Sequence, residues 1–173
     1  MKEKELRLLC KRILSKERYH HTLRVVALAK VLALRYGADV KKAKIAAYLH
    51  DVGYFIGRSK KDRSLSHAKL SESYAIKMGI TDSEVLEAIR VHTTGERGMG
   101  LLAKVIYVAD STEAGRTYPG VELIRRESRR NLDRACLMII HRTREHLRTK
   151  KKRLSRKTVQ FEKELKKRLQ EVH

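Results

Sequence analysis

Apolar side chains recur every three to four residues along most of the chain, and this period predicts helices rather than strands. The clearest stripe is Ala43, Ala46, Ala47 and His50, at i, i+3, i+4 and i+7. Between the helical segments, the glycine-bracketed basic stretch 53–63 is expected to be a loop. The predicted helices cover residues 3–16, 19–36, 40–51, 64–78, 82–92, 101–112, 119–147 and 158–170.

Small and polar residues mark the ends of these segments. Gly37 is expected to end the second helix, and Asp39 to cap the third. The run Thr81-Asp82-Ser83-Glu84 is a capping-box pattern, and Pro119 suits the first turn of the helix that follows it. The helical period and the signals at the helix ends together predict an all-α fold, a helical bundle.

The composition supports one helical domain. The chain has 173 residues, of which 42% are apolar and 5% aromatic, with one proline and no tryptophan. This length can bury a sizeable core, and so few breakers favour a bundle over a sandwich or barrel. Cys10 and Cys136 match no metal-ligand spacing, so a reducing cytoplasm is expected. The charged start lacks the apolar core of a signal peptide, and no apolar run approaches the roughly 20 residues that span a bilayer.

The charge is strongly positive and concentrated at the C-terminal end. The formal net charge is +21, which points to anionic partners rather than to a fold. Residues 148–173 hold eleven Lys or Arg against three Glu. We expect residues 1–150 to form the main domain and 151–173 a basic extension, which Val159, Leu165 and Leu169 would allow to be helical.

Histidines and aspartates stand where apolar residues would be expected. His21, His67, His92 and Asp110 each lie on the apolar side of their own predicted helix, and His50-Asp51 ends another. One histidine on an apolar face is usually a hydrogen-bonded core residue. Five helices that each present a His or Asp to the interior are harder to explain as core filling, because buried polar groups cost free energy unless partnered.

These six side chains predict a metal centre. Imidazole and carboxylate ligands without thiolate suit Fe, Mn, Co, Ni or Zn, and six ligands exceed the needs of one four-coordinate zinc. If they converge, two divalent ions about 3.5–4 Å apart become feasible, with Asp51 between them. His21, His50, Asp51 and Asp110 would hold one ion, and His67 and His92 the other. Such a pair activates a bridging hydroxide for attack on phosphorus.

The order of these motifs resembles a known family. Arg18-Tyr19-His20-His21, Leu49-His50-Asp51, His67, Ala88 to Gly95, and Val108-Ala109-Asp110 followed by residues 111–121 and Ile124-Arg125 are similar to the HD-domain phosphohydrolase superfamily, and more narrowly to the YqeK family. The resemblance covers roughly residues 15–150. It implies an all-helical HD fold, a di-iron-type site, and symmetrical hydrolysis of diadenosine tetraphosphate to two ADP.

The resemblance also implies roles for individual residues. His21, His50, Asp51, His67, His92 and Asp110 would be metal ligands, and Thr93, Gly95, Lys104, Glu113 and Arg116 would lie on the substrate side. Catalysis would fall to His50 and Asp51 with Lys104 and Arg116. The two cations flank the Asp110 helix and can neutralise polyphosphate charge, while Gly95 allows close backbone approach to a phosphate. Surface roles for Glu113 and Arg116 remain open at this stage.

Two positions depart from the family pattern. Tyr54 stands where the family usually has a lysine, three residues after Asp51, and Ala114 replaces an expected proline. A tyrosine cannot supply a lysine's charge to a phosphate, so substrate choice is open. Arg58, Lys60 or Lys61 are candidates to compensate.

Three functions are therefore weighed. The first is a dinucleoside tetraphosphatase, with two metal ions, iron favoured, and a homodimer left open. The second keeps the site but acts on a nucleoside monophosphate or a cyclic dinucleotide. The third is an RNA- or ribosome-associated module that binds phosphate backbones through Lys150-Lys151-Lys152-Arg153. For that run, a solvated lysine-rich surface typical of heat-adapted proteins is the alternative.

Overall fold

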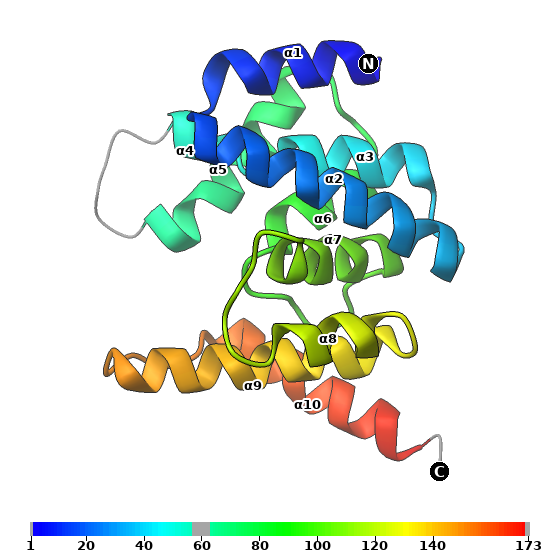
Figure 1. Ribbon diagram of the computed structural model, residues 1–173, viewed down its shortest axis with the longest axis vertical. Coiled ribbons are helices and arrows are strands. Elements are labelled where there is room, and N and C mark those ends of the chain that lie inside the picture. Colours follow the sequence, from blue (N-terminus) through cyan, green and yellow to red (C-terminus); the bar gives the residue numbers. More distant parts are fainter. Residues whose placement is uncertain (1, 57–62, 172–173) are drawn as a thin grey trace.

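The computed structural model describes residues 2–56 and 63–171 of the chain (Figure 1). Within those ranges the protein contains helices and no strands, so the all-α prediction is confirmed. The helices are α1 Glu3–Ile13, α2 Lys16–Tyr36, α3 Val40–Leu49, α4 Gly53–Ile56, α5 Arg63–Lys77, α6 Ser83–Val91, α7 Leu101–Thr112, α8 Val121–Ser128, α9 Leu132–Thr149 and α10 Arg156–Gln170. None of the described helices is both long and apolar enough to cross a membrane.

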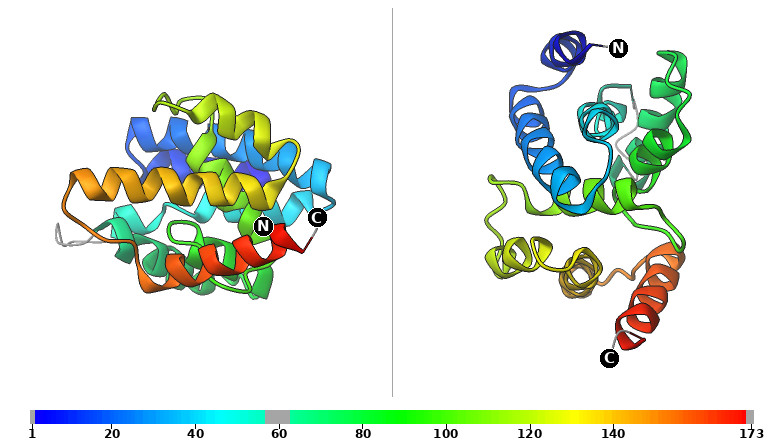
Figure 2. Two further views of the ribbon diagram at one scale, coloured as in Figure 1. Left: turned by 90° about the horizontal axis from the view of Figure 1, so that it is seen from below. Right: turned by 90° about the vertical axis from the view of Figure 1, so that its right-hand side faces the viewer.

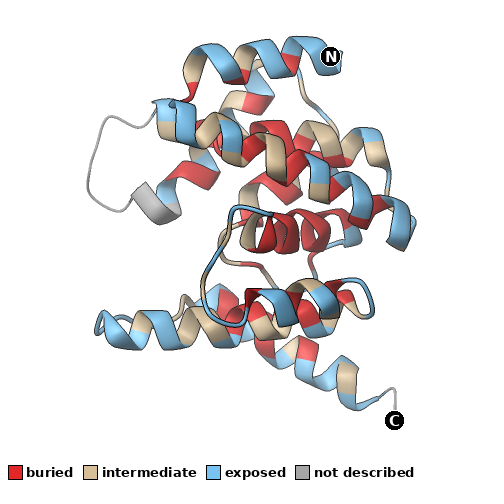
Figure 3. Cartoon of the chain, viewed as in Figure 1, coloured by how far each residue is buried: buried red, intermediate tan, exposed pale blue. Residues whose placement is uncertain are grey.

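Helix α7 is the centre of the bundle. Nine of its twelve residues are buried, because α2, α3 and α6 pack on one side and α8 and α9 on the other. The views in Figures 1 and 2 show α7 between these two groups of helices, and burial is densest at this level of the molecule (Figure 3). Side chains on α7 therefore face two groups of helices, α2, α3 and α6 on one side and α8 and α9 on the other.

The alanine stripe of α3 is buried as its period predicts. Ala43, Ala46 and Ala47 are fully buried, and their small side chains let α3 lie close to its neighbours. The Asp39 carboxylate accepts hydrogen bonds from the backbone N–H of Lys41 and Lys42, so the predicted cap is confirmed. This packing brings the C-terminal end of α3, where His50 follows, into the interior.

Three local predictions were wrong. Residues 53–56 form the short helix α4 rather than loop, and Arg58, Lys60 and Lys61 lie outside the described residues. Asp82, not Thr81, caps α6, because its carboxylate accepts from the N–H of Glu84 and Val85. The long helix expected over residues 119–147 is divided into α8 and α9 by a turn, after which the Asn131 side chain caps α9.

The C-terminal helix α10 packs against the bundle. Phe161 and Leu165 are fully buried and belong to the same core as α7. The Thr158 hydroxyl donates to the Thr94 carbonyl oxygen at 2.9 Å. Gly95, at φ +61°, lies so close to the Phe161 ring that a Cβ there would be 2.5 Å from Cδ1. Helix α10 thus supports the loop that follows α6.

Candidate metal centre and substrate cavity

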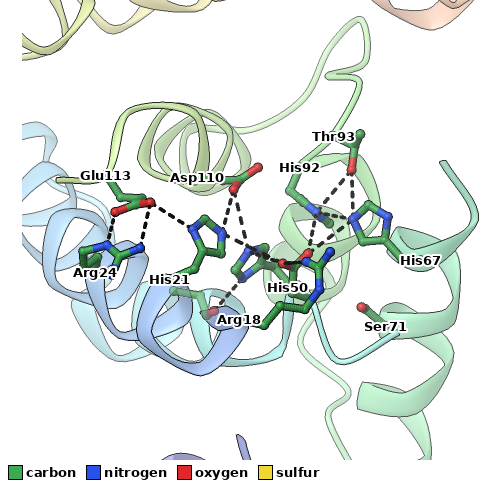
Figure 4. A network of polar contacts seen from close by, with 12 residues as sticks. Arg18, His21, Arg24, His50, His67, Ser71, His92, Thr93, Asp110 and Glu113 are labelled. Carbon is green, nitrogen blue, oxygen red and sulfur yellow. Dashed lines mark hydrogen bonds and ion pairs between the residues drawn. The ribbon is translucent and has the colours of Figure 1, made fainter. Parts of the chain in front are cut away.

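The structure brings all six predicted metal ligands together, and Figure 4 labels each of them except Asp51. His50 and His92 are the residues at which α3 and α6 end, so both rings extend the apolar faces of their helices into the core. Four members of the group are at least 96% buried. The six side chains come from five places in the chain: His21 on α2, His50 and Asp51 after α3, His67 on α5, His92 after α6 and Asp110 on α7.

Asp51 lies between two pairs of histidines. Its Oδ1 is 3.3 Å from His67 Nε2 and 3.7 Å from His92 Nε2. Its Oδ2 is 3.6 Å from His50 Nε2 and 3.9 Å from His21 Nε2. Two groups that could each hold a metal ion result, and Asp51 belongs to both.

Asp110 completes the first of these groups. Its Oδ1 is 3.0 Å from His21 Nε2 and 3.9 Å from His50 Nε2. The opposite edge of each ring is anchored elsewhere: His50 Nδ1 is 2.7 Å from the Ala47 carbonyl oxygen, and His92 Nδ1 is 2.7 Å from that of Ile89. Because a carbonyl oxygen only accepts, both Nδ1 atoms carry the proton. Each Nε2 of a neutral ring then offers its lone pair to the centre.

The side chains present fit a cationic metal. Among the described residues, His50 Nε2 is buried without a hydrogen-bond partner, and His67 Nε2 lies 2.9 Å from His92 Nε2. A buried unpartnered nitrogen is costly, and a metal ion at the lone pair of His50 Nε2 would remove that cost. Burial lowers the pKa of His50 to about 4, so its ring is neutral near pH 7. Burial alone would raise the pKa of Asp51, but the neighbouring histidines outweigh it and keep the carboxylate ionised. These are the protonation states in which the side chains bind metal.

Divalent metal should raise the melting temperature. The ligands are buried and converge only in the folded chain, so metal binds the native state in preference to the unfolded one. At a hundredfold excess over Kd we expect about 2.7 kcal/mol of added stability, or a shift of about 5–10 °C for a chain of this length. Calorimetry after chelator dialysis, with and without Mn²⁺ or Fe²⁺, measures it. An unchanged transition would contradict the metal assignment.

Glu113 orients His21 from behind. Its carboxylate is 98% buried; Oε1 lies 3.1 Å from His21 Nδ1, and Oε2 accepts from the Gly115 N–H at 2.5 Å. The Arg24 guanidinium pairs with the same carboxylate through Nε and Nη2. Carboxylates that hold the far nitrogen of a ligating histidine fix its tautomer and raise its basicity. This position supports the metal side of the cavity rather than a surface ion pair.

Glu113→Gln should weaken metal binding about 10- to 100-fold, because the amide keeps the shape but removes the charge behind His21. Competition with a chelator measures the affinity. Arg24→Gln leaves the His21 contact in place and should have a smaller effect. Glu145→Gln, an exposed carboxylate on α9, serves as the control with no change. Equal affinities for all three variants would show that Glu113 does not act on the metal.

A cavity of about 460 Å³ opens directly above the centre. Thr93 lines it, with its hydroxyl 3.2 Å from His92 Nε2 and 3.4 Å from His67 Nε2. Arg116 lines it too and donates from Nη2 to Asp110 Oδ1 at 2.8 Å and from Nε to the Asp110 carbonyl oxygen at 3.0 Å. A second cavity of about 300 Å³, which contains Tyr118 and Arg142, shares Asp110 and Arg116 with the first. The first cavity therefore combines side chains of the metal centre with three arginines, Arg18, Arg24 and Arg116, and with the carboxylates of Glu17 and Glu113.

Two predicted substrate residues lie elsewhere. Lys104 is buried on another side of α7, where its Nζ pairs with Asp133 Oδ1 at 2.6 Å, and it does not line the cavity above the centre. Gly95 does not line that cavity either; its missing side chain makes room for Phe161. In the structure, Lys104 thus makes an ion pair and Gly95 makes a packing contact, both away from this cavity.

Three arginines escaped the sequence-based prediction. Arg18 and Arg24 line the cavity, and their spacing of three residues on either side of His21 was the available signal, since it puts them on one helix face. Arg125 donates to the carbonyl oxygens of Thr112, Glu113 and Arg116 and thereby holds the turn that carries Glu113 and Arg116. The role of Arg125 cannot be predicted from a local sequence pattern, because the carbonyl groups that it binds belong to another segment.

Fold and site together define a helical bundle built around a His/Asp cluster that could hold metal, at the base of a cavity lined in part by three arginines. The family model described as "HD domain" matches residues 18–115, which contain all six candidate ligands. The chain belongs to the HD domain family and is an HD-domain phosphohydrolase, as the sequence resemblance indicated.

Several relatives are similar over most of their length. A protein of Bacillus subtilis named symmetrical bis(5'-nucleosyl)-tetraphosphatase is 37% identical over 150 residues, which are 77% of this chain and 81% of that protein. One of the same name from Halalkalibacterium halodurans is 38% identical over 142 residues, 72% and 75% of the two chains. Ribonuclease Y of Geobacter sulfurreducens is 32% identical over 98 residues, only 18% of its length.

A solved structure shares the whole fold. A Clostridium acetobutylicum protein described as a predicted HD superfamily hydrolase involved in NAD metabolism superposes with a TM-score of 0.86. The match has 32% sequence identity and covers 97% of this chain and 98% of the other. The similarity therefore includes α8, α9 and α10, which lie beyond the matched HD segment.

Proposed function

We propose that the protein is a metal-dependent hydrolase that cleaves diadenosine tetraphosphate symmetrically into two ADP. The observation that carries the proposal is the position of Asp51, whose two carboxylate oxygens face two separate histidine pairs beneath a cavity that contains three arginines. Relatives over two thirds or more of their length bear the name of this activity.

We propose two divalent ions, with iron favoured over Mn, Co, Ni and Zn, since the donors are imidazoles and carboxylates. His21, His50 and Asp110 would hold one ion, His67 and His92 the other, and Asp51 both. When bound, the metal pair supplies an activated water and Lewis-acid stabilisation of phosphate charge. Histidines bind metal as neutral imidazoles, so two divalent ions held by four histidines and two ionised aspartates would leave the centre net positive, and it would attract a polyphosphate.

The chain's own residues would bind and align the phosphates. Arg116 lies where the two cavities meet and offers a planar donor group to phosphate oxygens on either side. The Thr93 hydroxyl lies beside His67 and His92 and can donate to an oxygen above that half of the centre. We propose that one half of the dinucleotide lies above the centre and the other extends toward Tyr118. This arrangement puts the middle of the tetraphosphate chain near Asp110.

Product analysis tests the proposal. Metal-reconstituted protein is incubated without oxygen with diadenosine tetraphosphate, and the products are separated by ion exchange. ADP alone is the expected result. AMP plus ATP would overturn the symmetrical position of attack. No product from a metal-loaded protein would overturn the substrate, and a panel of nucleoside monophosphates and cyclic dinucleotides would then identify the alternative.

A basic surface supports nucleic-acid binding as a second candidate function. Residues 148–157, which run from the end of α9 through the connecting segment into the start of α10, contain seven Lys or Arg and no acidic residue. Of these, Arg148 pairs with Glu145 and Lys157 with Glu96, while Lys150–Arg153 are exposed. One relative of the HD segment is named a ribonuclease. We propose that residues 151–173 add this surface to a catalytic domain formed by 1–150.

Salt dependence separates this function from a merely solvated surface. If residues 148–157 bind an RNA backbone, log K for a single-stranded oligonucleotide should fall linearly with log salt concentration, by about 0.7 per neutralised phosphate. Replacing Lys150, Lys151 and Lys152 together by Gln should reduce the slope. Absence of binding at low salt, or an unchanged slope in the variant, would leave this surface without an RNA function.

A further inference from the structure

Three side chains from three helices form one stack at the edge of the cavity. The guanidinium carbon of Arg18, on α2, lies 3.2 Å from the ring centre of Tyr54, on α4. The Tyr54 ring lies parallel to the His67 ring of α5, with 4.1 Å between centroids and 20° between planes. All three residues line the cavity above the metal centre. The stack therefore joins a surface-accessible cation to a candidate metal ligand.

We propose that Arg18 binds phosphate oxygens of the substrate and that Tyr54 is the positioning residue that holds its guanidinium in place. The inference rests on the proposed polyphosphate hydrolase function and assigns the charge recognition at that same site. Neither residue is among the ligands of the metal centre described above. The chemical group recognised is the phosphate chain, not the base.

Among the described residues, Arg18 makes fewer side-chain hydrogen bonds than the other two cavity arginines, Arg24 and Arg116. Arg24 directs Nε and Nη2 to Glu113, and Arg116 directs Nε and Nη2 to Asp110. Arg18 directs Nη1 to Asp51 Oδ2, at 2.7 Å. Its side chain is 36% exposed, so the remainder of the planar group is open to the cavity. A guanidinium in this position presents a fork of N–H groups that matches two phosphate oxygens.

Stacking explains how a long side chain keeps that orientation. An aromatic face attracts the guanidinium but occupies only its face, so the N–H donors on its edge stay available. Tyr54 is itself held between Arg18 and His67, and Gly53 anchors α4 by donating its N–H to Ser71 Oγ at 2.8 Å. Tyr54 thus contributes no charge of its own, but it fixes where the charge of Arg18 lies. This arrangement supplies a cation beside the position at which the tyrosine replaces a lysine.

Four variants test the pair. Arg18→Met removes the charge and keeps the length, Tyr54→Leu removes the ring, and Tyr54→Phe keeps the ring. Lys30→Met removes a cation from the exposed side of the same helix and serves as the matched control. Each metal-loaded protein is assayed with diadenosine tetraphosphate and with bis(p-nitrophenyl) phosphate, a monoanion. Pyrophosphate affinity is measured by titration calorimetry, and metal content by elemental analysis.

The expected result is weaker binding of multiply charged ligands only. Arg18→Met should raise KM for the tetraphosphate about 30-fold, and Tyr54→Leu about 10-fold, with less than about threefold change for the monoanion. Pyrophosphate affinity should fall in parallel. Tyr54→Phe and Lys30→Met should behave like the unmodified protein, and metal content should stay constant in all variants.

Other outcomes would overturn the assignment. Equal losses for both substrates, metal depletion, or a Tyr54→Phe variant as impaired as Tyr54→Leu would show a structural or catalytic role other than phosphate binding. If the unmodified protein fails to cleave diadenosine tetraphosphate, the proposed function fails. Pyrophosphate titration still decides the role of Arg18 in that case, because it needs no turnover.

Discussion

Asp51→Asn should abolish both metal retention and hydrolysis. The amide keeps the size of the side chain but removes the charge that faces all four histidine Nε2 atoms within 3.9 Å. Loss of the shared ligand affects both halves of the centre, because Asp51 belongs to each of the two metal-binding groups. We expect turnover to fall at least about a thousandfold, since the metals supply the nucleophile and the charge stabilisation.

The measurement combines elemental analysis, circular dichroism and product formation. Glu17→Gln is the control, because Glu17 is a carboxylate of the same cavity that belongs to neither metal group. The control should retain metal, and both variants should keep their helical content. A metal-free but active Asp51→Asn protein would exclude metal-assisted hydrolysis, and one that retained both ions would remove Asp51 from its bridging position.

Ligand residues were predictable because each violates the pattern that surrounds it. A histidine or aspartate stands out at a helical position where the pattern calls for an apolar residue. In the fold, each of these side chains lies next to other histidines and aspartates in the interior. His50 and His92 illustrate this most clearly, since each follows the last residue of an otherwise apolar helix stripe. The signal is local, so one sequence suffices to detect it.

The phase of a helix also explains why Lys104 lies away from the metal centre. Six residues separate Lys104 from Asp110, and at 100° per residue the two side chains point about 120° apart on α7. A cation near Asp110 in sequence therefore faces Asp133 instead of the metal centre. In contrast, Arg18 and Arg24 lie three residues before and after His21, so each points only about 60° away from it around α2, and both line the cavity. Each arginine is thus closer in helix phase to its candidate ligand than Lys104 is to Asp110.

Long-range packing could not be predicted from the sequence alone. The role of Gly95 depends on Phe161, which lies 66 positions later, and that of Arg125 on carbonyl groups of another segment. The division between α8 and α9 was also missed. The Asn131 side chain caps α9, but the surrounding sequence has a strong helical period that gives no sign of a break. Each of these features becomes visible only when the tertiary contacts are known.

Gly53→Ala should destabilise the fold and empty the metal centre. A Cβ at this position would lie 2.0 Å from the His67 carbonyl oxygen and 2.8 Å from the Ser71 backbone nitrogen. Both contacts are with the backbone of α5, so no side-chain rotation can relieve them, and the helix that carries His67 must move. Overpacking in a tight core costs typically about 1–3 kcal/mol and sometimes more, and we expect the upper end here.

Urea unfolding and chelator competition measure the two effects together. Gly100→Ala is the matched control, because its Cβ would meet only the flexible end of Glu87, at 3.2 Å. That variant should lose less than about 1 kcal/mol, since Gly100 precedes the first turn of α7. If Gly53→Ala kept full stability and metal affinity, α5 could move away from position 53 without cost. The position of His67 beside Asp51 would then not depend on a glycine at residue 53.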